Sequence, residues 1–242
     1  MTPPSPQHLF QTLDATWPPA RFVDIGPWRL REGQGGGQRV SAATITGEIT
    51  EQDIDSAEQG MADLGQHPLF MIRAEDSTLD AWLAGRGYDV VDPVTLYAIP
   101  ANRIAQSYPP AIVISAWPPL AMQTDIWSGG GIGPERIAVM ARAETGTAIL
   151  CRREDTPAAT VFVATDGEIA MVHALEVAPE ERRNGMGEVA MRAAAAWAAA
   201  NKATWVTLAV TKANAGANAL YQKLGMTPAG AYHYRRAPKA AA

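Results

Sequence analysis

Apolar and polar positions alternate along the chain in short blocks that predict a mixture of helices and strands. Helical periodicity is expected over 7–15, 51–64 and 77–85, and extended segments over 28–32, 38–46, 70–73 and 90–99. Thr50 is placed to cap the second of these helices. Pro100 ends this part of the chain, and the stretch that follows, 102–110, is typical of a linker.

Beyond the linker the apolar and helix-favouring segments predict strands and a helix more clearly. The apolar stretch Met171–Val177 predicts a strand that Pro179 ends, and Glu188–Ala200 is rich in residues that favour helices. A further strand is expected over Trp205–Val210. We therefore predict an α/β (α+β) protein of two domains, with a boundary in the linker: residues 1–105 and 106–242.

The turn between that strand and that helix has the composition of a phosphate-binding site. It reads Arg182, Arg183, Asn184, Gly185, Met186, Gly187. Glycine lets the backbone approach a ligand closely, the first amides of a helix lack partners within it, and the helix dipole adds partial positive charge. A P-loop is excluded because no Gly-Lys-Ser/Thr follows. A dinucleotide loop is excluded because only two glycines fit and no acidic residue follows about 20 positions later.

A second motif accompanies this turn. The turn reads R-x-x-G-x-G, and residues 214–226 read N-x-x-A-x-x-L-Y-x-K-x-G-M. Together and in this order they resemble the GCN5-related N-acetyltransferase (GNAT) superfamily, with Met226 in place of the usual Phe. The resemblance implies a mixed, mostly antiparallel sheet that is splayed at the acyl-CoA site and flanked by helices. It also implies an acyl-CoA-dependent N-acyltransferase in the second domain.

The resemblance assigns expected roles to individual residues. The turn over 182–187 would hold the pyrophosphate of the co-substrate acetyl-CoA, with Asn214 and Lys223 as further contacts. The exposed backbone near Leu175, Glu176 and Val177 would bind the pantetheine arm and the thioester oxygen. Tyr221 would donate a proton to the departing thiolate, for which a phenol with a pKa of about 10 is suited. Asn214 is also placed to cap its helix.

The general base has two candidates. His173 lies nine residues before Arg182, and an ideal strand with a period of two places it on one face with Leu175 and Val177. Its ordinary pKa of about 6.5 suits proton abstraction near neutrality. Glu176 would lie on the opposite face unless a bulge re-aims it, and a carboxylate with a raised pKa could also serve as the base. The sequence leaves this choice open.

The first domain contains a weaker copy of the same pattern. A helix, a glycine and a strand follow one another at 82–88 as they do at 220–226, with Leu83 in the place of Tyr221. Its counterpart of the phosphate turn, Gly47–Asp53, carries acidic residues that repel phosphate. We interpret residues 1–105 as a degenerate GNAT-like half in a tandem arrangement; an unrelated α/β domain is the alternative.

Two glycine runs remain. The first, Gly33–Gly37, is bracketed by predicted strands and indicates a hairpin loop rather than an anion site. The second, Gly129–Gly133, precedes a predicted helix over Glu135–Ala143. The resemblance places this region over the acceptor pocket, as a mobile lid or an ordinary loop.

Composition and charge argue against several classes of binding partner. A formal net charge of −5, without a long basic run, argues against nucleic acid, and no apolar stretch is long enough to span a membrane. The single cysteine, Cys151, excludes internal disulfides and fits a cytoplasmic protein; it is expected to be a plain strand residue, with a reactive thiol as the alternative. No metal is expected, because no His, Asp or Glu cluster has ligand spacing.

These patterns predict transfer of an acetyl group from acetyl-CoA to a primary amine of a small molecule or peptide, by direct attack in a ternary complex. A non-catalytic acyl-CoA-binding protein and an O-acyltransferase are the alternatives. We expect a monomer or a homodimer.

Overall fold

The computed structural model describes residues 2–238, which form two compact units. The first unit contains residues 2–18, 96–210 and 214–230. The second contains 19–95, 211–213 and 231–238. Strands β5 (Asp89–Pro100) and β11 (Thr227–Arg236) each supply residues to both units.

In the first unit a mixed sheet has the strand order β5-β10-β9-β8-β7-β6. The new strands are β6 (Val113–Ala116), β7 (Gly146–Arg153), β8 (Thr156–Asp166), β9 (Ile169–Val177) and β10 (Trp205–Thr211). Strands β6, β7, β8 and β9 pair with one another in antiparallel fashion, whereas β9 pairs with β10 in parallel. The helix between those two strands is therefore the crossover that a parallel pair requires.

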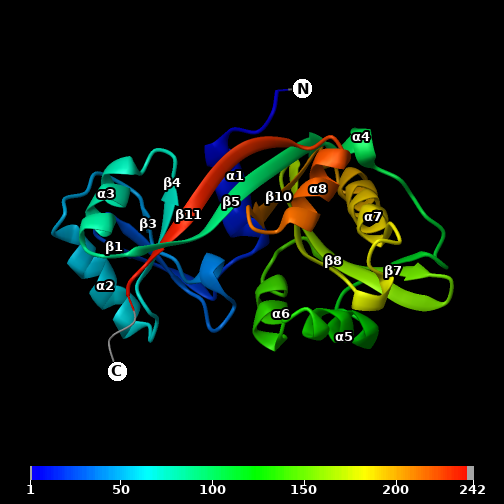
Figure 1. Ribbon diagram of the computed structural model, residues 1–242, viewed down its shortest axis with the longest axis horizontal. Helices are drawn as coiled ribbons and strands as arrows, with labels where there is room; N and C mark the ends of the chain where they lie inside the picture. The colour runs from blue at the N-terminus through cyan, green and yellow to red at the C-terminus, as the bar shows by residue number, and fades with distance from the viewer. Residues whose placement is uncertain (1, 239–242) are drawn as a thin grey trace. The chain divides into compact units, whose positions relative to one another are not determined.

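That crossover helix, α7 (Met186–Ala200), packs on the sheet (Figure 1). Ala190, Ala194 and Ala198 are fully buried in a core that also holds Val161 and Val172 of the strands. The remaining helices of this unit are α1 (Pro6–Thr16), α4 (Ala101–Ile104), α5 (Ala121–Gly129), α6 (Pro134–Met140) and α8 (Ala215–Lys223), with a 3₁₀ turn, η2 (Pro179–Glu181), before α7.

The second unit has its own core. Strands β1 (Arg21–Ile25), β2 (Trp28–Glu32) and β3 (Thr44–Ile45) form one antiparallel sheet, while β4 (Leu69–Arg73) pairs with β11, which lies next to β5. Helices α2 (Asp53–Asp63) and α3 (Ser77–Gly85) and the 3₁₀ turn η1 (Gln38–Val40) complete the unit. Its core contains Trp28 and Phe70, whose rings are 5.3 Å apart.

The strand predicted over 38–46 is wrong for most of its length. Gly37, with a φ of 99°, leads into η1 rather than into a strand, so only Thr44 and Ile45 pair with β2. Thr50 does not cap the next helix. Instead the Asp53 carboxylate accepts hydrogen bonds from the Thr50 amide and hydroxyl, and the helix begins at Asp53. The sequence pattern also missed β1 and α5.

Helix α1 belongs to the first unit because it packs on β8 and β9. The units are thus divided differently from the predicted boundary at residue 105, and the tandem GNAT interpretation stays a prediction. The two parts do share one local structure. The amide of Tyr88 bonds the Leu83 carbonyl and the amide of Met226 bonds the Tyr221 carbonyl, each across a glycine of positive φ, which is the Schellman ending of a helix.

Candidate active site

The sheet of the first unit opens between two parallel strands. Strands β9 and β10 pair from Ile169 and Trp205 to Val172 and Leu208, and the pairing ends there. Within the described residues, the last five residues of β9 therefore have no partner on β10. This is the splay that the resemblance to the GNAT superfamily implies, and it leaves backbone N–H and C=O groups at an open strand edge.

A bulge in β9 accompanies the opening. Phe162 of β8 pairs with His173 and Thr160 pairs with Glu176, so Ala174 and Leu175 lie opposite a single residue. Ala174 has a φ of 50°, in the left-handed region that few residues other than glycine adopt. Its carbonyl accepts a 2.7 Å hydrogen bond from the indole nitrogen of Trp127, which is fully buried on α5.

The bulge overturns the prediction that His173, Leu175 and Val177 share a face. Leu175 and Val177 pack against the α7 side of the sheet, in the same core as Val172. His173 lies against Trp17, with ring centroids 4.9 Å apart. Successive side chains of a strand point to opposite faces of the sheet. The extra residue in β9 therefore moves Leu175 and Val177 to the face opposite His173.

The His173 side chain makes a polar contact with α1. Its side chain is buried, and its Nε2 lies 2.9 Å from the Thr16 hydroxyl. Thr16 donates its only hydroxyl proton to the Thr12 carbonyl at 2.6 Å. His173 Nε2 must therefore carry the proton of this hydrogen bond, so that nitrogen holds no lone pair for an incoming amine.

Glu176 is more accessible. Its side chain is 23% exposed, and its carboxylate lies 3.3 Å from Arg182 Nη2. On its other side Gly130, at the end of α5, leaves the room that this carboxylate occupies: a methyl group there would lie 2.5 Å from Glu176 Cδ. The bulge and Gly130 together fix the position of a carboxylate at the open edge of β9.

The predicted phosphate turn begins α7 as expected. Gly185 caps the helix with a φ of 79°, and Arg183 also has a positive φ of 67°. The first amides with a recorded backbone partner are those of Glu188 and Val189, which bond the Gly185 carbonyl. For the amides from Arg183 to Gly187, residues 2–238 supply no recorded acceptor. Such a row of amides without acceptors at a helix start is suited to an anion.

Side chains in and around the turn form hydrogen bonds with neighbouring residues. Arg182 donates to the Val177 carbonyl at 3.3 Å as well as contacting Glu176, and Asn184 donates to Glu181. The buried Glu181 carboxylate also accepts two hydrogen bonds from Arg153, which lower its pKa.

Gly187 lies at a close approach between helices. An added methyl group there would lie 3.1 Å from the Leu220 side chain on α8 and 3.7 Å from that of Val177. The second glycine of the motif is therefore explained by packing, whereas Gly185 is explained by its backbone conformation. Met186 is buried in the core.

Tyr221 and its helix lie in the same unit. Tyr221 is buried beside Tyr97, with ring centroids 6.0 Å apart, and burial raises its pKa to about 12. Asn214 caps α8 by accepting a hydrogen bond from the Ala217 amide, as predicted. Lys223 bonds Glu188 of α7 at 2.8 Å.

Comparison with known proteins identifies the family of this chain. The sequence profile described as "Acetyltransferase (GNAT) family" matches residues 104–226, which is more than half of the chain. The chain belongs to the GNAT family. It is 28% identical over 234 residues to the uncharacterized N-acetyltransferase YobR of Bacillus subtilis, covering 91% of this chain and 94% of that protein.

Solved GNAT structures share its fold. A GCN5-related N-acetyltransferase from Kribbella flavida is similar with a TM-score of 0.73 and 21% identity, covering 96% of this chain and 95% of that one. A tandem GNAT protein from the clavulanic acid biosynthesis pathway is similar with a TM-score of 0.58 and 13% identity, covering 83% of this chain and 74% of that one. These likenesses confirm the predicted fold class.

GNAT enzymes use acetyl-CoA as a co-substrate, and both GNAT motifs predicted from the sequence lie within the matched region. Three residues of the candidate site were not assigned these roles by the sequence: Trp127, Gly130 and Thr16. Gly130 carried a signal as part of a glycine run. Within residues 2–238, neither a helix suited to crossing a membrane nor a group of three potential metal ligands is found.

Proposed function

We propose that this protein transfers an acetyl group from acetyl-CoA to a primary amine of a small molecule or peptide, by direct attack of the amine in a ternary complex. One observation carries the proposal: the open edge of β9 ends at a helix whose first amides are free to bind an anion. An extended pantetheine arm ending in a pyrophosphate requires this sequence of groups.

The backbone of the first unit would bind and polarise the donor. Amides from Arg183 to Gly187 would hold the pyrophosphate. Backbone groups of Leu175 to Val177 at the open edge, other than the Val177 carbonyl that Arg182 bonds, would bond the pantetheine amides and the thioester oxygen. A single preorganised N–H donor stabilises a developing oxyanion by about 3 kcal/mol. Lys223 and Arg192 both bond Glu188, and this offsets the negative charge of a carboxylate in the first turn of α7.

Glu176 is our preferred base. Its carboxylate is partly exposed and sits on the bulge, one residue from Leu175 and Val177, whereas His173 is buried with its Nε2 proton committed to Thr16. An amine must lose a proton during attack, and a carboxylate can accept it directly or through one water. Arg182 holds the carboxylate in place without removing it from solvent.

Tyr221 is our proposed donor to the departing thiolate. With its pKa raised to about 12, its phenol stays protonated at physiological pH. No described residue is recorded as bonding its hydroxyl, so the proton remains available. Because a thiol such as cysteine has a pKa of about 8.5, Tyr221 would stabilise the thiolate chiefly through a hydrogen bond rather than by complete proton transfer.

The proposal is tested by following free-thiol release when the purified protein is mixed with acetyl-CoA and a panel of amines, peptides and alcohols. We expect turnover with at least one amine. Tight binding of acetyl-CoA without turnover on any acceptor would show a non-catalytic acyl-CoA-binding protein, and turnover only with alcohols would show an O-acyltransferase.

The phosphate turn is tested separately by Gly185→Leu. Gly185 and Gly167 both have positive φ and open space around an added methyl group, so leucine introduces similar backbone strain of about 1–2 kcal/mol at each. We expect Gly185→Leu to weaken acetyl-CoA binding at least about tenfold, or 1.4 kcal/mol, in calorimetry, and Gly167→Leu to leave it unchanged. Equal affinities in the two variants would refute the turn as the anion site.

A further inference from the structure

A buried carboxylate lies directly before the phosphate turn, residues 182–187. Glu181 is the last residue of η2, and its side chain is only 8% exposed. A negative charge at this place would repel the pyrophosphate unless another group balanced it. On the basis of the proposed function, we propose that Arg153 and Glu181 are positioning residues: together they hold the phosphate turn in the conformation that binds acetyl-CoA, and Arg153 balances the charge of Glu181.

Arg153 and Glu181 form a bidentate ion pair. Arg153 Nε donates to Glu181 Oε2 at 2.6 Å, and Nη2 donates to Oε1 at 3.2 Å. A planar guanidinium matches both oxygens of a carboxylate, so the pair fixes the orientation of Glu181 as well as balancing its charge. Glu154 also lies 3.7 Å from Arg153 Nη1, but its side chain is 86% exposed and water screens this second contact. The buried carboxylate is therefore the principal partner of Arg153.

The Glu181 carboxylate contacts the turn through Asn184. Asn184 Nδ2 donates to Glu181 Oε2 at 3.3 Å, the same oxygen that accepts from Arg153 Nε. Asn184 lies between two residues of left-handed backbone, Arg183 with a φ of 67° and Gly185 with a φ of 79°. This conformation is unfavourable for a residue other than glycine and persists where surrounding contacts hold it. The bond from Asn184 to Glu181 is such a contact, and it holds the amides of the turn in place.

Glu181 is itself anchored to the sheet. Its amide bonds the Ala178 carbonyl at 2.9 Å, and the Ala178 amide bonds the Ala158 carbonyl of β8 at 3.0 Å. The carboxylate thus meets the turn from a fixed backbone. Loss of the Arg153 bonds would weaken acetyl-CoA binding in two ways, because the turn would be held less firmly and an unbalanced negative charge would lie beside the anion.

The affinity for acetyl-CoA tests the role of Arg153. In titration calorimetry on the full chain, Arg153→Met should weaken binding about tenfold, because two hydrogen bonds between charged groups are lost. Arg152→Met removes the same charge one residue earlier, where the arginine contacts the exposed Asp155, and should leave the affinity unchanged. S-acetylpantetheine lacks the pyrophosphate, so its affinity should be the same in Arg153→Met and the wild type.

A double-mutant cycle separates a positioning role of Arg153 from direct contact with the pyrophosphate. In a Glu181→Gln background no carboxylate remains for Arg153 to balance, so Arg153→Met should weaken acetyl-CoA binding less than about twofold further. An undiminished loss would show that Arg153 contacts the ligand directly and would overturn the positioning role.

Trypsin tests the hold on the turn without any ligand, because the turn contains Arg182 and Arg183. The amide of Glu181→Gln has a single acceptor oxygen for the three donors of Arg153 and Asn184, so the turn should loosen. Mass spectrometry should detect cleavage after Arg182 or Arg183 about fivefold faster than in the wild type.

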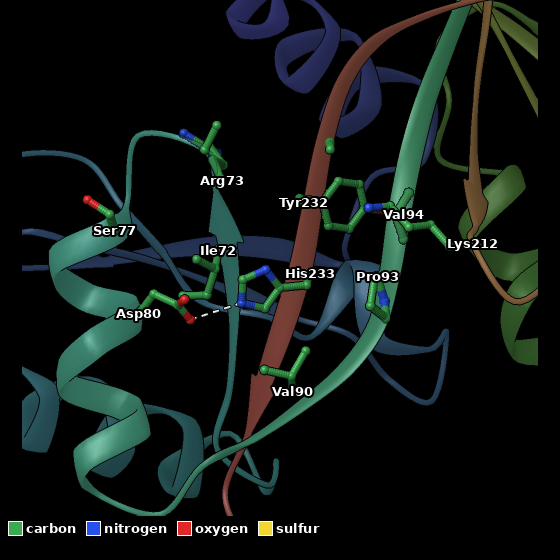
Figure 2. Close-up of a pocket in the computed structure, with 12 residues that line it drawn as sticks. Ile72, Arg73, Ser77, Asp80, Val90, Pro93, Val94, Lys212, Tyr232 and His233 are labelled. Carbon is green, nitrogen blue, oxygen red and sulfur yellow. Dashed lines mark hydrogen bonds and ion pairs between the residues drawn. The ribbon is translucent and has the colours of Figure 1, made fainter.

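Asp80→Asn is the matched control for Glu181→Gln. Asp80 is a carboxylate of the second unit that also bonds an arginine. It accepts hydrogen bonds from Arg235 Nε at 2.7 Å and, as Figure 2 shows, from His233 Nε2 at 2.9 Å. The same chemical change there should leave cleavage at the turn unchanged.

The outcomes distinguish this proposal from the proposed function. If the wild type does not bind acetyl-CoA, the proposed function fails, whereas the trypsin experiment still tests whether Glu181 holds the turn. If the wild type binds and Arg153→Met binds equally well, only the positioning role fails. Equal weakening in Arg152→Met, a parallel loss of affinity for S-acetylpantetheine, or unchanged cleavage in Glu181→Gln would each overturn the positioning role as well.

Discussion

The position of the Glu176 carboxylate can be changed without altering Glu176 itself. Gly130 approaches it so closely that a methyl group on Gly130 would lie 2.5 Å from Cδ and 2.7 Å from Cγ and Oε2. Ordinary contact begins near 3.4 Å, so the carboxylate of a Gly130→Ala variant must retreat by roughly 1 Å. A displacement of this size at a reacting group lowers a rate by about 10²-fold.

We therefore expect Gly130→Ala to lower kcat about 10²-fold while changing the affinity for acetyl-CoA less than twofold. The free energy of unfolding should fall by only about 1 kcal/mol, because the atoms that must move are the end of a partly exposed side chain. Gly129→Ala is the matched control: the same change one residue earlier meets no atom within 4 Å. Neither glycine has a positive φ, so alanine fits the backbone at both positions.

The assay is the initial rate of thiol release with an amine that supports turnover, together with calorimetry for acetyl-CoA. Equal kcat in the Gly130→Ala and Gly129→Ala variants would refute the reasoning. A double-mutant cycle sharpens the result. In a Glu176→Gln background, where no base remains, Gly130→Ala should lower kcat no further; an equal additional loss would place its effect elsewhere in the site.

Three further predictions concern other residues of the first unit. Tyr221→Phe should lower kcat by about 10²-fold and leave acetyl-CoA affinity within twofold, and equal losses in initial rates and in calorimetry would make it a binding residue. Cys151 should resist alkylation by iodoacetamide at pH 8 until the protein is unfolded, because burial raises its pKa to about 12; labelling of the native protein within minutes, seen by mass spectrometry, would contradict this. Lys223 and Arg192 lower the pKa of Glu188 below its ordinary 4.5, so its ion pairs stabilise the fold above that pH and are lost as pH falls through the lowered pKa. Glu188→Gln should therefore be about 0.5–1 kcal/mol less stable at pH 7 in urea denaturation, with the gap closing below pH 4.5; a gap that stays constant down to pH 3 would count against it.

The sequence was most informative where structure is local. The strand–turn–helix over 171–200 was predictable because Gly185, the alanine-rich helix and the following strand each carry their signal within a few residues. Asn214 as a helix cap and the glycine ending at Gly225 were predictable for the same reason.

Features that depend on distant contacts could not be predicted. Ala174 carries no sign of a bulge, because alanine seldom adopts a positive φ; the indole of Trp127, 47 residues earlier, stabilises its carbonyl. Period-two reasoning therefore placed Leu175 on the wrong face. Likewise, nothing near Thr16 indicates that its hydroxyl accepts a hydrogen bond from His173, since the two residues lie 157 positions apart.

The hydrogen-bond partners of the β9 backbone relate the bulge to the proposed chemistry. A buried or half-buried strand normally pairs both edges, because an unpaired peptide group loses free energy comparable to a lost hydrogen bond. Beyond Val172, β9 keeps its partner β8 on one side. On the other side the described part of the chain supplies no strand partner, and Arg182 donates to the Val177 carbonyl. The Trp127 indole satisfies Ala174 in place of a sheet neighbour, so the strand can leave β10 without leaving that carbonyl unpaired. The open groups that remain have the spacing of a β-strand, and an extended chain of two amides, such as pantetheine, can pair with them as an added strand would. The same bulge that turns Glu176 toward Gly130 thus also keeps the edge beside it available for the donor.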